Sequence, residues 1–167
     1  MSPAILIVAA SLSLIALSSQ PHSQPPPRAT VAPPGTPWKE ADRRAIAKIL
    51  AQLKTEATKL DERLRALTTG KAGPDRQRRL EAYRQASEVV WSRSHELRVA
   101  VENAGATKKM VGTLARLHRN ATKTQVHAKG LGNEANATAL SEAARHVTVL
   151  LRDKSDVAAL LEPIVSR

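Results

Sequence analysis

One unbroken series of apolar residues constrains the fold of this chain more than any other feature. Its members follow one another at steps of four and three positions: Ile46, Leu50, Leu53, Ala57, Leu60, Leu64 and Leu67. An α-helix turns once in about 3.6 residues, so this spacing places the whole series on one narrow face. That face stays in contact with water unless other helices cover it. The series therefore predicts a long helix packed lengthwise against further helices.

Three later segments repeat the same spacing of apolar and small residues. The second segment carries Leu80, Tyr83, Ser87, Val90, Ser94, Leu97 and Val101; the third carries Met110, Leu114, Leu117, Ala121 and Ala128; and the fourth carries Ala137, Leu140, Ala144, Val147 and Leu151. Each segment therefore predicts a helix that buries one face.

Turn-forming residues separate these segments. We expect the first helix to begin at Pro37 with Thr36 as its N-cap, and to end at Gly70 in a left-handed conformation. The second should run from about residue 75 to 103, the third from about 107 to 130, and the fourth from about 133. Ser155 is expected to interrupt the fourth helix, and Pro163 to end it.

The composition favours helices over sheets. The chain has 167 residues, with no Phe, one Tyr and two Trp, so its core must be built from aliphatic side chains. Loops of a few residues between four helices predict an all-α domain, an antiparallel up-down four-helix bundle with long amphipathic helices, over residues 37–167. The same spacing would also allow two open helical hairpins that dimerise.

The N-terminal segment predicts export. Residues 4–17 form an uncharged apolar run that is about 21 Å long as a helix, short of the roughly 30 Å hydrocarbon core of a membrane. Ala16 and Ser18 are the small residues that a signal peptidase requires before a cut after Ser18. Residues 1–18 are therefore expected to be a signal peptide of a secreted or periplasmic protein. The alternative is an uncleaved membrane anchor, since no Lys or Arg precedes the run.

Residues 19–36 are predicted to be a linker. Prolines recur throughout this segment, and proline at high density favours an extended, solvated chain over helix or sheet.

The charge of the chain points to an anionic partner. Its 26 Lys and Arg outnumber 15 Asp and Glu, giving a net charge of +11 and a pI of about 10.7. There is no cysteine, which excludes disulfides, thiolate metal sites and a cysteine nucleophile.

No motif predicts an enzyme, a cofactor or a metal site. The chain has no Gly-x-Ser-x-Gly turn, no Gly-rich phosphate loop and no His-x-x-His or Glu-x-x-His pair. Its five histidines are interpreted as surface or boundary residues, and they are His22, His95, His118, His127 and His146.

The third helix carries an unusual charge distribution. No acidic residue occurs between Glu102 and Glu134, whereas six Lys and Arg occur there. At about 100° per residue, five of these cations fall on the side opposite the apolar residues. They are the predicted anion-binding residues Lys108, Lys109, Arg116, Arg119 and Lys123. The alternative is that acids on a neighbouring helix neutralise this face.

Two triplets have the pattern of glycosylation sites, at Asn120 and Asn136. They would be used only if the chain is exported by a eukaryotic cell.

Three functional hypotheses follow. The first is an exported, non-enzymatic bundle that binds an anionic polymer, a membrane surface or an acidic protein through the third helix; export would argue against a nucleic acid. The second is a carrier of lipid or apolar ligands, or a surface-active bundle that opens on lipid. The third is a structural or adaptor subunit that pairs, or self-associates, through its coiled-coil-like heptad faces.

Overall fold

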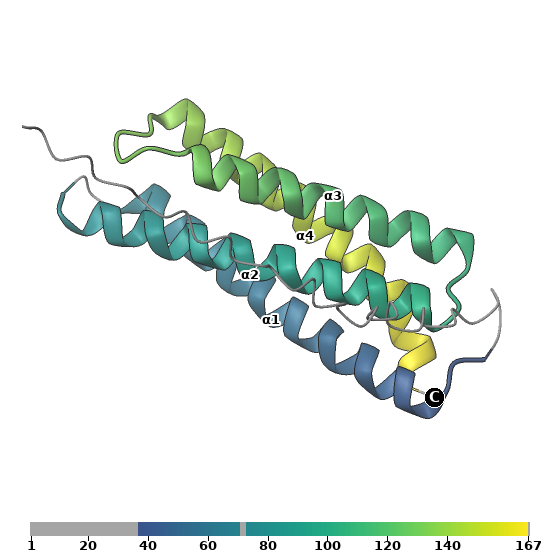
Figure 1. The fold of residues 1–167 in the computed structure, drawn as a ribbon. Helices are drawn as coiled ribbons and strands as arrows, with labels where there is room; N and C mark the ends of the chain where they lie inside the picture. Colours follow the sequence, from purple (N-terminus) through teal and green to yellow (C-terminus); the bar gives the residue numbers. More distant parts are fainter. Residues whose placement is uncertain (1–36, 71–72, 167) are drawn as a thin grey trace, which may run out of the picture.

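The computed structural model describes residues 37–70 and 73–166. This part of the chain forms four helices and no strands (Figure 1). The helices are α1 (Glu40–Thr69), α2 (Asp75–Asn103), α3 (Lys108–Gly130) and α4 (Ala137–Val165). The predicted all-helical class is thereby confirmed, while the predicted signal peptide and linker lie outside the described residues.

Two helix starts and the conformation of one C-cap residue differ from the predictions, whereas α1 ends at Thr69, directly before Gly70, as predicted. α1 begins at Glu40 after Lys39, three residues beyond Pro37, and Gly70 at its end has a φ of −72°, so no left-handed residue is needed there. α4 begins later than predicted because the side chain of Asn136 accepts a hydrogen bond from the N–H of Ala139 at 2.9 Å.

α4 also runs without interruption past Ser155 and includes Pro163. The Ser155 hydroxyl donates to the carbonyl of Leu151 at 3.1 Å, a local hydrogen bond that an intact helix accommodates. The two predicted breaks in this helix are therefore wrong.

The cores of α1 and α2 were predicted correctly. The buried residues of α1 are the seven of the apolar series, from Ile46 to Leu67, and those of α2 are the seven predicted from Leu80 to Val101. The two buried serines of α2 satisfy their hydroxyls locally, since Ser87 donates to the carbonyl of Arg84 and Ser94 to that of Trp91. Small polar residues can therefore occupy this core without an unsatisfied donor.

The predicted cores of α3 and α4 were less accurate. On α3, Leu114, Leu117, Ala121 and Ala128 are buried, but Met110 is only half-buried. On α4 only Val147 of the predicted set is buried, because the true buried face is displaced around the helix. It consists of Ala143, Val147, Leu150, Asp153, Val157, Ala158 and Leu161.

The four helices pack against one another in a closed cycle. α1 contacts α2 and α4, and α3 contacts α2 and α4. Two arginines of α2 reach across to the connection between α3 and α4: Arg76 donates to the carbonyl of Ala135, and Arg84 to the carbonyls of Ala128 and Leu131. The bonds from Arg84 satisfy carbonyls at the end of α3, and the bond from Arg76 satisfies one just before α4. Part of the positive charge of the chain is therefore used structurally.

Candidate anion-binding surface

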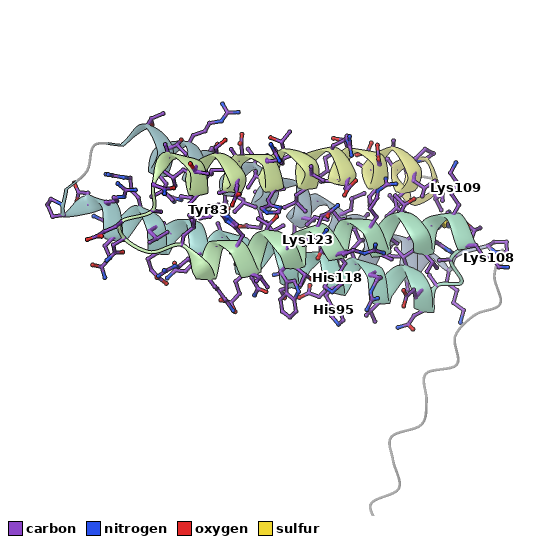
Figure 2. The ribbon with its side chains drawn as sticks, turned by 90° about the horizontal axis from the view of Figure 1, so that it is seen from above. Tyr83, His95, Lys108, Lys109, His118 and Lys123 are labelled. Carbon is purple, nitrogen blue, oxygen red and sulfur yellow. The ribbon has the colours of Figure 1, made fainter. Side chains whose placement is uncertain are left out.

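The five cations predicted to bind an anion all lie on α3, and all five are exposed. They are Lys108, Lys109, Arg116, Arg119 and Lys123. α3 begins after Thr107, whose hydroxyl accepts a hydrogen bond from the N–H of Met110 at 3.4 Å. Figure 2 shows Lys108 and Lys109 at the start of this helix and Lys123 farther along it. The structure thus spreads these charges over much of the length of α3.

Arg116 differs from the other four because acids of α4 neutralise it. Its Nε donates to Oδ1 of Asp153 at 2.9 Å, and its Nη2 to Oδ2 of Asp156 at 2.6 Å. Asp153 is only 1% exposed, and its second oxygen accepts a hydrogen bond from Asn120. Neutralisation by a neighbouring helix, the alternative drawn from the sequence, therefore holds for Arg116.

Lys108, Lys109, Arg119 and Lys123 form no ion pair with any described residue, and we call these four the cationic face. Near the C-terminal end of α3, two basic side chains lie close to acids of the neighbouring helices. Lys129 Nζ lies 3.7 Å from Oε1 of Glu88 on α2, and His127 Nε2 lies 3.5 Å from Oε2 of Glu142 on α4. Within α3, the positive charge that no described acid pairs with thus lies on the side turned away from the buried residues of the helix.

A pair of histidines joins α3 to α4 beside the cationic face. The ring centroids of His127 and His146 are 5.1 Å apart. Burial lowers the pKa of His146, and the nearby His127, Lys123 and Arg145 lower it further, whereas Glu142 acts in the opposite direction. His146 therefore resists protonation in a positively charged neighbourhood.

A second pair of histidines joins α2 to α3. The rings of His95 and His118 lie 5.3 Å apart, each within 6.4 Å of the Trp91 ring, and Figure 2 shows both histidines on the same side of the bundle. The Ser94 hydroxyl lies 2.9 Å from Nδ1 of His118. Burial, followed by the charges of Arg98 and His95, lowers the pKa of His118.

Neither histidine pair could be predicted from the spacing of residues in the sequence. Each pair is formed across two helices, so it depends on how far one helix is shifted along the other. One feature of the sequence pointed to the second pair: His95 and His118 directly follow Ser94 and Leu117, which are buried. Residues that flank a buried face lie where neighbouring helices meet.

The two predicted glycosylation sites take part in local structure in different ways. Asn120 donates from Nδ2, the atom that a glycan would modify, to the buried carboxylate of Asp153. Asn136 uses its Oδ1 to cap α4, which leaves its Nδ2 outside that bond. Modification of Asn120 would therefore break a buried contact, whereas Asn136 is compatible with a glycan.

No group of three or more His, Cys, Asp or Glu in the described residues is arranged to hold a metal ion. None of the four helices is both long enough and apolar enough to cross a membrane.

Comparison with protein-family models, curated proteins and solved structures found no match to this chain.

Proposed function

We propose that this chain is an exported, non-enzymatic protein that binds an anionic polymer through the cationic face of α3. The observation that carries the proposal is the absence of ion pairs at Lys108, Lys109, Arg119 and Lys123 within the described residues, on a helix without any acid. A solvated helix face usually mixes charges of both signs, as α1 does with its pairs Glu40–Arg44 and Glu56–Lys59. A polyanion would supply the charge that the cationic face lacks.

The proposed bundle is an antiparallel up-down arrangement of long amphipathic helices. Support comes from the short connections between helices and from the closed cycle of contacts. The end of α4 also lies near the start of α1 in Figure 1. Such a bundle presents α3 as a rigid rod, so its charges would be spaced along a polymer without a binding cleft.

An extended polymer fits the cationic face better than a single small anion. The four cations extend over 16 residues, from Lys108 to Lys123, or about 24 Å of helix. Arg116 within this stretch holds α3 to α4 and so keeps the surrounding charges in place. Several separated contacts of this kind would give an affinity that falls steeply with salt.

Binding to immobilised heparin, a sulfated polysaccharide, tests this proposal at two salt concentrations. Anionic vesicles and an acidic protein serve as comparison ligands, and stronger binding to either would identify a membrane surface or an acidic protein as the partner instead.

Mass spectrometry of the secreted protein tests export, with an N-terminus expected near Ser19 or Gln20. Retention of Met1 on membrane-bound material would favour the uncleaved anchor.

A further inference from the structure

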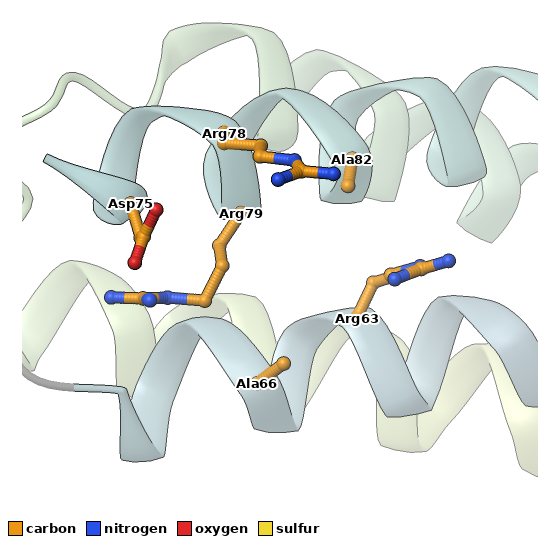
Figure 3. Close-up of a pocket in the computed structure, with 6 residues that line it drawn as sticks. All are labelled: Arg63, Ala66, Asp75, Arg78, Arg79 and Ala82. Carbon is orange, nitrogen blue, oxygen red and sulfur yellow. The ribbon is translucent and has the colours of Figure 1, made fainter.

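A second group of arginines lies between α1 and α2 and uses no residue of α3. It surrounds a cavity of about 330 Å³, close to the connection between the two helices (Figure 3). The cavity is lined by Arg63 and Ala66 of α1 and by Asp75, Arg78, Arg79 and Ala82 of α2. Its volume is at the small end of the roughly 300–1,000 Å³ found for ligand pockets.

Short side chains create the hollow. Ala66 and Ala82 line it from the two facing helices, where longer side chains would fill the space. Their methyl groups offer an apolar lining with no hydrogen-bonding group of its own.

Arg79 forms part of the wall of this cavity. Its guanidinium packs so closely over Gly70 that a Cβ at that position would lie 2.6 Å from Nε and Cζ of Arg79. Figure 3 shows the same guanidinium beside the carboxylate of Asp75. Arg79 carries one positive formal charge and Asp75 one negative formal charge, so the two residues together add no net charge to the lining of the cavity.

Arg63 and Arg78 remain as the uncompensated charges. Both side chains are exposed, both line the cavity, and neither forms an ion pair with a described residue. They come from different helices, and in Figure 3 both side chains extend along the helices in the same direction, away from Asp75. Both positive charges would attract an anion bound in this cavity.

We propose that Arg63 and Arg78 form a binding site for a phosphate monoester. Each guanidinium can donate two parallel N–H bonds to a phosphate group, which favours arginine for this chemistry. Two arginines also match the charge of a phosphate monoester, about −1.5 to −2 at pH 7. The ester is carried by a small soluble molecule or by a lipid headgroup, which share this chemistry.

Titration calorimetry with glucose 6-phosphate tests the site, with glucose as the uncharged comparison. One equivalent of the phosphate ester should bind and glucose should not. Arg63→Gln and Arg78→Gln should each weaken binding at least tenfold. Lys48→Gln removes the same charge from an exposed, unpaired position of α1 and should change the affinity less than twofold. Equal weakening by Lys48→Gln, or no binding to the original protein, would overturn the proposal.

A charge-neutral variant separates the site from a general effect of charge. Ala66→Leu leaves both arginines in place but fills the cavity, and Ala66 is exposed, so the fold should be retained. This variant should lose glucose 6-phosphate binding while its circular dichroism spectrum stays unchanged. Retained affinity in the folded variant would show that the cavity is not the binding site.

Two further experiments identify the molecule that carries the ester and test whether the phosphate binds independently of the cationic face. Vesicles containing phosphatidic acid are compared with phosphatidylserine vesicles of equal surface charge. A preference for phosphatidic acid that Arg78→Gln abolishes would assign a lipid source, whereas binding of glucose 6-phosphate alone would assign a soluble one. Lys109→Gln/Lys123→Gln should leave glucose 6-phosphate binding intact. The phosphate site and the polyanion-binding cationic face can therefore each fail without affecting the test of the other.

Discussion

Arg116 of α3 donates from Nε to Oδ1 of Asp153 on α4 at 2.9 Å, and the carboxylate it contacts is 1% exposed. This contact links the cationic face to the packing of the bundle. The Arg116 side chain is itself 49% exposed, so the pair lies at the boundary between core and solvent. A buried carboxylate requires such a partner, because an unpaired charge away from water is strongly destabilising.

Arg116→Met should therefore lower the free energy of unfolding, by about 1–3 kcal/mol, since Asp153 would keep only its hydrogen bond from Asn120. Urea denaturation measures this. Lys109→Met removes an unpaired cation from the same helix and should change stability by less than about 0.5 kcal/mol. The double variant Arg116→Met/Asp153→Leu should recover part of the loss. Equal stabilities for the two single variants would contradict a structural role for Arg116.

Leu60→Ala tests the packed face of α1. Leu60 is fully buried at the middle of the apolar series, so its truncation should cost about 2–5 kcal/mol through lost burial and a residual cavity. Thermal unfolding provides the measurement, and Lys48→Ala, at an exposed position of α1, serves as control. An unchanged transition temperature for Leu60→Ala would mean that this face is not packed.

Tyr83→Phe should leave stability unchanged or raise it by up to about 1 kcal/mol. Tyr83 is fully buried, and its hydroxyl has no hydrogen-bond partner among the described residues; burial also raises its pKa above the ordinary value. Ser94→Ala is the opposite case, because its hydroxyl bonds to Trp91 and His118, and its loss should be destabilising. A marked loss of stability in Tyr83→Phe would indicate that the hydroxyl has a partner after all.

Acidification should destabilise the fold through two histidines. The pKa values of His118 and His146 are lowered by burial from the ordinary 6.5, so the unfolded chain binds protons more readily than the folded one. Stability is therefore highest above about pH 6.5 and falls as the pH decreases through the range below it. Thermal unfolding between pH 7.5 and 5.5 measures the effect, which should be smaller in His118→Gln/His146→Gln. An unaltered pH dependence in this double variant would assign the loss to other groups.

The parts of the fold that could be predicted are those that depend on local periodicity. In α1 and α2 the apolar and small residues repeat without a gap, so the buried residues follow directly from the spacing. In α4 many small and aliphatic residues occur on several sides, so alanines such as Ala137 and Ala144 could not be ranked for burial by type. The buried Asp153 breaks the apolar pattern, and only its contact with Arg116 explains why a carboxylate is tolerated there.

The candidate site shows the same limit. The charge asymmetry of α3 is visible in the sequence, but the sequence does not show which of its cations pair with acids of neighbouring helices. Arg116 and Lys123 are equivalent by helical angle, yet Arg116 meets two aspartates of α4 while Lys123 pairs with no acid among the described residues. The cavity beside Arg63 and Arg78 likewise depends on how α1 lies against α2.

The salt dependence of heparin binding in two matched double variants tests the central claim most directly. Lys109→Gln/Lys123→Gln removes two charges from the cationic face. Lys39→Gln/Lys48→Gln removes two exposed lysine charges that form no ion pair with any described residue, from the N-cap and the first part of α1, a helix that does not contact α3. For nucleic-acid-like polymers each contact contributes roughly −0.7 to −0.9 to the slope of log affinity against log salt. We expect the slope to become shallower by about 1.4–1.8 in the α3 variant and to change little in the α1 variant. Equal losses of affinity and slope in both variants would show that only net charge matters, and would contradict binding through α3.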